Sequence, residues 1–153
     1  MLIIHTAGGS DGASLVSLRR YDFEGSSIEV EVAKPGPRAP TKITKLLLSL
    51  DDQHQLSIGF ENGEVSAYSQ LNGRYHSTPP VADDGGFARL RMSEDGGTVR
   101  FEAGHGGQWR LLGTQTDPLG VPLRSLRVAL ESFAYSVVDA GGDAVFDNLN
   151  AKP

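Results

Sequence analysis

Hydrophobic and polar residues alternate along much of the chain. In segment 26–33, Ile28, Val30 and Val32 alternate with Glu29 and Glu31. A β-strand points successive side chains to opposite faces, so this pattern predicts a strand with one face in a core and the other in water. The same alternation recurs in three later segments, 88–92, 99–102 and 126–131.

Glycine-centred turn sequences separate these segments, at roughly the 8 to 12 residue spacing of an all-β sandwich or barrel. They are Asn62-Gly63, Asn72-Gly73, Asp95-Gly96 and the segment 104–107. Asn-Gly and Asp-Gly readily adopt the positive φ of tight hairpins. We therefore expect an all-β fold, an antiparallel two-sheet β-sandwich. Segment 43–50, with three contiguous leucines, fits a strand buried on both faces, and a short helix is the alternative.

Two longer connections interrupt the pattern. Segment 34–40 holds three prolines, which lack amide donors, so it is expected to be an exposed loop. Segment 71–86 is expected to be the second loop, and it contains Tyr75 and His76. Long loops on a rigid scaffold are frequent sites of recognition.

Composition narrows the possible functions. The 153 residues fit a single domain, 1–153, which can equally be a domain excised from a larger protein. With 19 acidic against 14 basic residues, a dedicated nucleic-acid binder is not expected. The lack of cysteine excludes a disulfide scaffold, thiolate metal sites and a cysteine nucleophile. No stretch approaches the ~18 apolar residues of a membrane-spanning helix, so neither membrane insertion nor a signal peptide is expected.

Several motifs occur in an order typical of one fold family. Segment 21–32 reads YDFEGSSIEVEV, segment 87–113 places an LR strand, a DG turn, an RF strand and G-x-W in sequence, and segment 144–149 reads AVFDNL. Together they resemble the concanavalin A-like (legume lectin/glucanase) jelly roll, and more narrowly the accessory domains at the C-termini of bacterial β-xylosidases. The resemblance implies a jelly-roll sandwich, a carbohydrate ligand, and an extracellular or cell-surface location within a larger bacterial protein.

One pair of carboxylates is a candidate for the catalysis that this fold family supports. Retaining glucanases that resemble it place Glu-x-Asp-x-x-Glu on one strand, which sets two carboxylates ~5 Å apart. Glu29 and Glu31 share one strand face, but Ala33 and Lys34 occupy the places of the third carboxylate. A solvated or salt-bridged strand face is the simpler interpretation. The sequence also has no Gly-x-Ser-x-Gly elbow and no paired histidines at helical spacing, so we predict that the chain is not an enzyme.

Basic residues suggest one possible binding surface. Arg89, Arg91 and Arg100 should project from one sheet face together with Glu102, where a uronic-acid glycan could be gripped by bidentate contacts. The alternative, which we favour, is that these arginines pair with glutamates across the sheet.

Aromatic residues suggest a second possible binding surface. Tyr68, Tyr75 and Trp109 have flat faces that could stack on sugar rings. Trp109, the G-x-W tryptophan, is expected mainly to pack, which makes Tyr75 and His76 the better candidates for glycan binding.

Acidic turns raise the question of a metal. Asp51-Asp52, Asp83-Asp84 and Asp147 could offer oxygen ligands to a structural calcium ion. Their spacing matches no calcium loop, and aspartates are ordinary turn formers, so no cofactor is predicted and calcium stays an alternative.

The function expected from all these observations is that of a non-catalytic carbohydrate-binding or attachment module. The alternative is a structural domain that packs on a neighbouring protein domain or self-associates. A glucanase-type glycoside hydrolase comes third.

Overall fold

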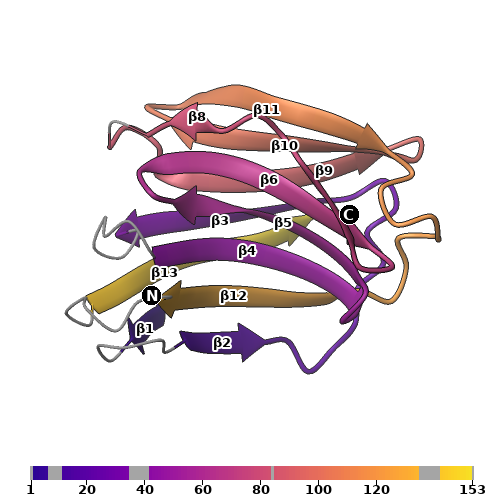
Figure 1. Cartoon of the computed structure of the whole chain (residues 1–153), viewed down its shortest axis with the longest axis horizontal. Helices are drawn as coiled ribbons and strands as arrows, with labels where there is room; N and C mark the ends of the chain where they lie inside the picture. Colours follow the sequence, from indigo (N-terminus) through magenta and orange to yellow (C-terminus); the bar gives the residue numbers. More distant parts are fainter. Residues whose placement is uncertain (1, 7–11, 35–41, 84, 135–141, 153) are drawn as a thin grey trace.

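A computed structural model describes residues 2–6, 12–34, 42–83, 85–134 and 142–152. Within these ranges every regular element is a β-strand, and none is a helix of the length and apolarity needed to cross a membrane. The strands form two antiparallel sheets that pack face to face as an open sandwich (Figure 1). The predicted all-β, two-sheet fold class is confirmed.

The two sheets contain six and seven strands. The six-stranded sheet has the order β1 (Leu2–Thr6), β13 (Gly142–Lys152), β3 (Ser27–Lys34), β9 (Arg89–Asp95), β10 (Thr98–His105) and β11 (Gln108–Thr116). The seven-stranded sheet has the order β2 (Gly12–Val16), β12 (Arg127–Ala134), β4 (Lys42–Asp51), β5 (His54–Glu61), β6 (Glu64–Leu71) and β7 (Arg74–Ser77), and β8 (Val81–Ala82) also pairs with β6.

The core lies between the sheets and is built from the alternating apolar residues. Val30, Leu90 and Phe101 come from neighbouring strands of one sheet and are fully buried. Leu46 and Ile58 oppose each other in the other sheet and are equally buried. Segment 43–50 is therefore a strand, as expected, and Leu47 on its second face is also buried.

Tight hairpins join several consecutive strands. Asn62 and Gly63 have φ of 55° and 74° between β5 and β6, and Asn72 and Gly73 have φ of 52° and 75° between β6 and β7. These left-handed conformations are the ones that the Asn-Gly pairs predict. Strands β4 to β7 consequently follow one another in the sheet as they do in the chain, which places their outward side chains in adjacent rows.

The prediction that segment 71–86 is a loop is wrong, and the other predicted loop, 34–40, lies almost entirely outside the described residues. Segment 71–86 contains the strands β7 and β8, and both Tyr75 and His76 lie on β7. All four residues of β7 are exposed, so this edge strand lacks the apolar alternation that would have revealed it. The proline-rich segment falls mostly on 35–41, outside the described residues.

Candidate functional site

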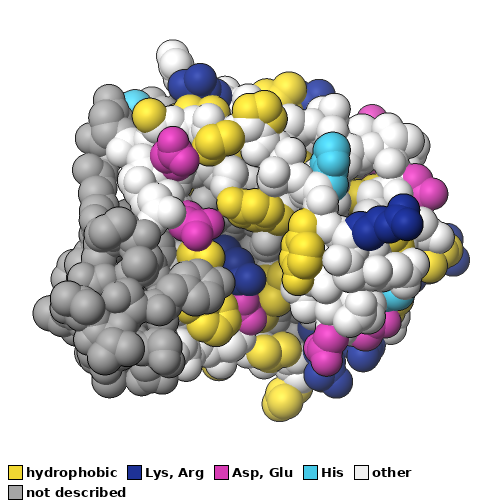
Figure 2. Space-filling model, viewed as in Figure 1, with side chains coloured by type: hydrophobic (Ala, Val, Ile, Leu, Met, Phe, Trp, Pro, Cys, Tyr) yellow, Lys and Arg dark blue, Asp and Glu magenta, His cyan; other side chains and the backbone are white. Residues whose placement is uncertain are grey.

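A groove of about 410 Å³ lies on the seven-stranded sheet, on the face turned away from the core. Figure 2 shows a hollow in the surface at which hydrophobic, basic and acidic side chains meet. Strands β4 to β7 supply the lining residues, which are Ile43, Lys45, Gln55, Ser57, Gly59, Glu61, Tyr68, Ser69, Gln70 and Tyr75.

Strand register explains why polar residues gather there. Gln55, Gln70 and Tyr75 stand opposite one another across β5, β6 and β7, and Ser57 stands opposite Tyr68 in the next row. Leu56 and Ile58, which alternate with Gln55 and Ser57 along β5, point into the core, so the hydrophobic alternation that builds the core also builds the groove.

Gly59 forms part of the groove floor beside Lys45. A Cβ at Gly59 would lie 2.5 Å from the Cβ of Lys45 and 2.6 Å from the carbonyl oxygen of Thr44. No other residue fits at this position without a shift of β4, so a glycine keeps the floor open.

The charged groups of the groove are partly paired. Lys45 Nζ lies 3.1 Å from Glu131 Oε2, and it stands 5.5 Å from the centre of the Phe133 ring. Glu131 also accepts a hydrogen bond from the hydroxyl of Ser14 at 3.2 Å. These contacts fix the ammonium group at one side of the groove and leave its charge balanced by a carboxylate.

Glu61 supplies a second carboxylate. The hydroxyl of Tyr68 donates a hydrogen bond to Glu61 Oε2 at 3.3 Å, which ties an aromatic ring of the groove to an acidic group. Flat aromatic faces with amide and hydroxyl groups around them can bind a ring that has an apolar face and polar edges.

The structure brings together only some of the residues proposed from the sequence. Tyr68 and Tyr75 both line the groove. His76 follows Tyr75 on β7 and lies opposite Ser69, on the other face of the sheet. The remaining candidates, Arg89, Arg91, Arg100 and Trp109, belong to strands β9, β10 and β11 of the other sheet, and none of them lines the groove.

Arg89, Arg91 and Trp109 form a stack on the outer face of the six-stranded sheet. The guanidinium carbons of Arg89 and Arg91 lie 4.7 and 4.1 Å from the centre of the Trp109 ring. Arg91 also forms an ion pair of 2.8 Å with Glu102, and Arg89 one of 3.4 Å with Glu29. Both guanidinium groups thus have carboxylate and aromatic partners.

Glu29 and Glu31, the carboxylate pair considered for catalysis, lie on this same outer face. Glu29 pairs with Arg89, and Glu31 accepts a hydrogen bond of 2.8 Å from the side chain of Asn148. Both glutamates belong to β3 of the six-stranded sheet, while the groove lies on the other sheet.

The acidic turn residues support local backbone. Asp51 accepts the N–H groups of Gln53 and His54, and the hydrogen bond with the His54 ring holds the pKa of Asp51 below its ordinary value. Asp83 accepts those of Gly85 and Phe87. Asp147 accepts the backbone N–H group of Asn148, and Asp84 lies outside the described residues. Over the ranges that the structure describes, no group of three or more His, Cys, Asp or Glu is placed to hold a metal ion.

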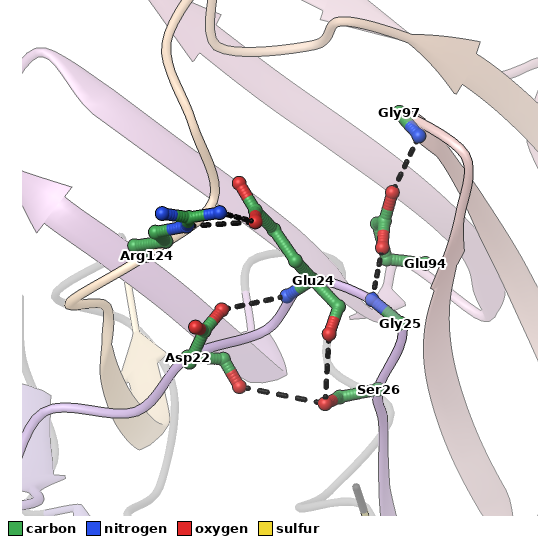
Figure 3. A network of polar contacts seen from close by, with 7 residues as sticks. All are labelled: Asp22, Glu24, Gly25, Ser26, Glu94, Gly97 and Arg124. Atoms are coloured by element: carbon green, nitrogen blue, oxygen red, sulfur yellow. Dashed lines mark hydrogen bonds and ion pairs between the residues drawn. The ribbon is translucent and has the colours of Figure 1, made fainter.

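A polar network anchors the opening motif at residues 22–26 (Figure 3). Glu94, at the end of β9, is buried and accepts the backbone N–H groups of Gly25 and Gly97. Arg124 binds Glu24 through two nitrogens at 2.6 and 2.7 Å. The carboxylate of Glu94 thus joins a loop and a hairpin that are far apart in the sequence.

Comparison with known proteins identifies the fold. No protein-family model matches the sequence, and no curated protein does. Among solved structures, the Crh5 transglycosylase in complex with NAG is similar with a TM-score of 0.71, at 16% identity over 98% of this chain and 71% of that one. The fold is the concanavalin A-like jelly roll.

Two further structures share the fold. A glycosyl hydrolase family protein from Mycobacterium fortuitum matches with a TM-score of 0.68, at 15% identity over 97% of this chain and 73% of that one. The GH43 protein BlXynB from Bacillus licheniformis matches with a TM-score of 0.68 and 12% identity, over 99% of this chain and 32% of that one. The second match agrees with the resemblance to a domain of β-xylosidases, at the level of fold.

The comparison overturns the prediction that the chain is not an enzyme. A transglycosylase and a glycosyl hydrolase family protein match over 71% and 73% of their own lengths, so this jelly roll makes up most of those chains. The carboxylates proposed from the sequence, Glu29 and Glu31 on β3, face outward from the six-stranded sheet. Glu61 and Glu131 were not among the predicted residues, and their strands β5 and β12 belong to the sheet that bears the groove. No short motif could have joined these two residues, which lie 70 positions apart in the numbering.

Proposed function

We propose that this jelly roll binds a carbohydrate chain in the groove of the seven-stranded sheet. The observation that carries the proposal is the placement of Tyr68 and Tyr75 in one groove with Gln55, Gln70 and Ser57. Aromatic faces stack on the C–H face of a pyranose, while amides and hydroxyls exchange hydrogen bonds with its hydroxyl groups. The carbohydrate-related names of proteins with the same fold support the same ligand class.

The tyrosines provide the test. Tyr75 is 73% exposed, so its replacement by alanine removes a stacking surface without opening a cavity. We expect Tyr75→Ala and Tyr68→Ala each to weaken binding of an oligosaccharide selected on a glycan array by about tenfold or more, a loss of ~1.4 kcal/mol. Isothermal titration calorimetry of the purified variants measures this loss of affinity.

Tyr21→Ala is the matched control. Tyr21 is also an exposed tyrosine, 41% accessible, but it lies outside the groove, so this variant should bind as the wild type does. Unchanged affinity in both groove variants would contradict the proposal.

A second candidate is cleavage or transfer of the bound glycan, favoured by the two carboxylates on the groove side. Glu131 stands opposite Lys45, which stands opposite Gly59, two residues from Glu61 on β5. Glycoside chemistry uses a pair of carboxyl groups, one as acid and the other as base or nucleophile.

Product formation from the selected oligosaccharide, followed by chromatography, tests this candidate. Glu61→Gln and Glu131→Gln keep shape and remove charge, and each should reduce turnover by at least a hundredfold while glycan affinity is largely retained. Glu29→Gln, on the other sheet, is the control and should turn over normally. Equal turnover in all three variants would exclude this pair.

A further inference from the structure

A second cleft, of about 550 Å³, opens at the edge of the sandwich between β7 and β11. We call it the edge cleft. Ser69 and Tyr75 line both this cleft and the groove, so the two hollows meet at the exposed Tyr75 ring. A glycan chain in the groove can therefore place a branch or a terminal unit in the edge cleft.

Hydrogen-bond donors collect in the edge cleft. Arg74 and His76 alternate with Tyr75 along β7, so both point to the side opposite the groove. Both side chains are exposed, and neither has a hydrogen-bond or ion-pair partner within the described residues.

Gln115 adds a donor from the facing strand β11. Its side chain lines the edge cleft and is only 8% exposed, and its amide nitrogen Nε2 has no hydrogen-bond partner. Buried N–H groups in proteins nearly always have an acceptor, so an unpaired one beside a cleft indicates that an oxygen ligand belongs there.

The other charged group of the edge cleft is Asp117, whose carboxylate can accept hydrogen bonds from hydroxyl groups. A ligand that fits this set carries a carboxylate for Arg74 and hydroxyls for Asp117. Guanidinium binds a carboxylate through two parallel hydrogen bonds, which an uncharged sugar cannot offer.

We propose that the edge cleft binds the carboxylate of a uronic acid unit belonging to the glycan that occupies the groove, an inference that rests on the proposed function. Arg74 holds the carboxylate, with His76 and Gln115 as additional donors, and Asp117 accepts from the sugar hydroxyls. The sequence suggested Arg89, Arg91 and Arg100 for this ligand. Arg89 and Arg91 have Glu29, Glu102 and Trp109 as partners on the far sheet, and Arg100 is exposed on the same outer face.

The test compares two probes that differ in one group. The first is a xylo-oligosaccharide with a glucuronic acid branch, and the second is the same molecule after reduction of its carboxyl to an alcohol. We expect the wild type to bind the acidic probe about tenfold more tightly by isothermal titration at low salt, and Arg74→Ala to lose this preference while binding the reduced probe as before. The acidic probe alone should shift the side-chain amide signals of Gln115 in ¹⁵N spectra.

Arg100→Ala is the matched control, because Arg100 is an exposed arginine on the outer face of the other sheet and should keep the preference. Equal affinity of the wild type for both probes would overturn the proposal that the edge cleft binds a carboxylate, and it would not contradict glycan binding in the groove. A preference lost only in Arg100→Ala would also overturn it, by assigning the carboxylate to the outer face. If neither probe bound, while the array gave no other ligand, the proposed function itself would fall, and this inference with it.

Discussion

Glu94 joins two distant parts of the chain through a single buried carboxylate. Its Oε atoms accept the N–H groups of Gly25 and Gly97, and its side chain is 7% exposed. Glu94→Ala leaves both donors without an acceptor, so we expect the free energy of unfolding to fall by about 2–4 kcal/mol. Urea denaturation measures the loss.

The neighbouring Asp95→Ala is the control for that experiment. Asp95 is exposed, and its side chain has no hydrogen-bond or ion-pair partner among the described residues, so its removal should change stability by less than about 0.5 kcal/mol. A similar loss of unfolding free energy in both variants would show that the two hydrogen bonds of Glu94 to the backbone do not account for its contribution to stability.

Gly104 determines where Trp109 lies. A Cβ at this position would come within 2.9 Å of the indole and 3.2 Å of Arg89 Cβ. Gly104→Ala should therefore displace the ring from the two guanidinium groups, shift the fluorescence of the only tryptophan, and destabilise the protein by about 1–3 kcal/mol. Thr114→Ala, also on the outer face of this sheet, should leave the emission unchanged, and a wild-type spectrum in Gly104→Ala would refute the account.

At the scale of elements, the turn from β4 to β5 depends on Asp51. The hydrogen bond with the His54 ring, followed by that from the N–H of Gln53, lowers the pKa of the folded carboxyl below 3.8. A lowered pKa in the folded state means that the stability from this group is complete above pH ~4 and disappears as the pH falls through the lowered value.

Asp51→Asn should therefore unfold more readily than the wild type near neutral pH, and the two curves of urea midpoint against pH should converge once the pH has fallen through the lowered pKa of Asp51. The adjacent Asp52→Asn provides the control, since Asp52 is exposed and makes no such contact. A constant difference between Asp51→Asn and the wild type at all pH values would show that the carboxylate charge is not involved.

The elements that the sequence predicted are those that bury one face. Strands β3, β9, β10 and β12 alternate because the core demands it, and their positions were predicted correctly. Strand β7 buries no residue, so nothing in its composition distinguishes it from a loop. Tyr75 was proposed as a binding residue because a long loop was expected to carry it, whereas strand β7 positions it.

At the scale of the whole molecule, the groove could not be read from the sequence. Its side chains come from four strands, and the register that aligns them depends on hairpin geometry over the 33 residues from Ile43 to Tyr75. Only the aromatic residues, Tyr68 and Tyr75, gave a signal of their own. Lys45, Glu61 and Glu131 resemble ordinary surface charges until the sheet places them together.

The order of strands predicts which ends of the chain the fold requires. Strand β13 lies inside the six-stranded sheet, between β1 and β3, whereas β1 is an edge. A chain that stops at residue 141 leaves β1 and β3 without their shared neighbour, so it should show no cooperative unfolding transition by circular dichroism. A chain that begins at residue 7 loses only an edge strand and should retain a transition at lower urea. Cooperative unfolding of the first chain would contradict this view of the sheet.

The apolar core separates two outer surfaces that share no side chain, the groove on one sheet and the arginine and tryptophan stack on the other. Changes at such distant sites are expected to add independently. Because the sequence has no cysteine, a single cysteine introduced by Arg100→Cys would be a unique chemical handle on the face opposite the groove. A dye, a bead or a sensor surface attached there would leave the groove directed toward the solution.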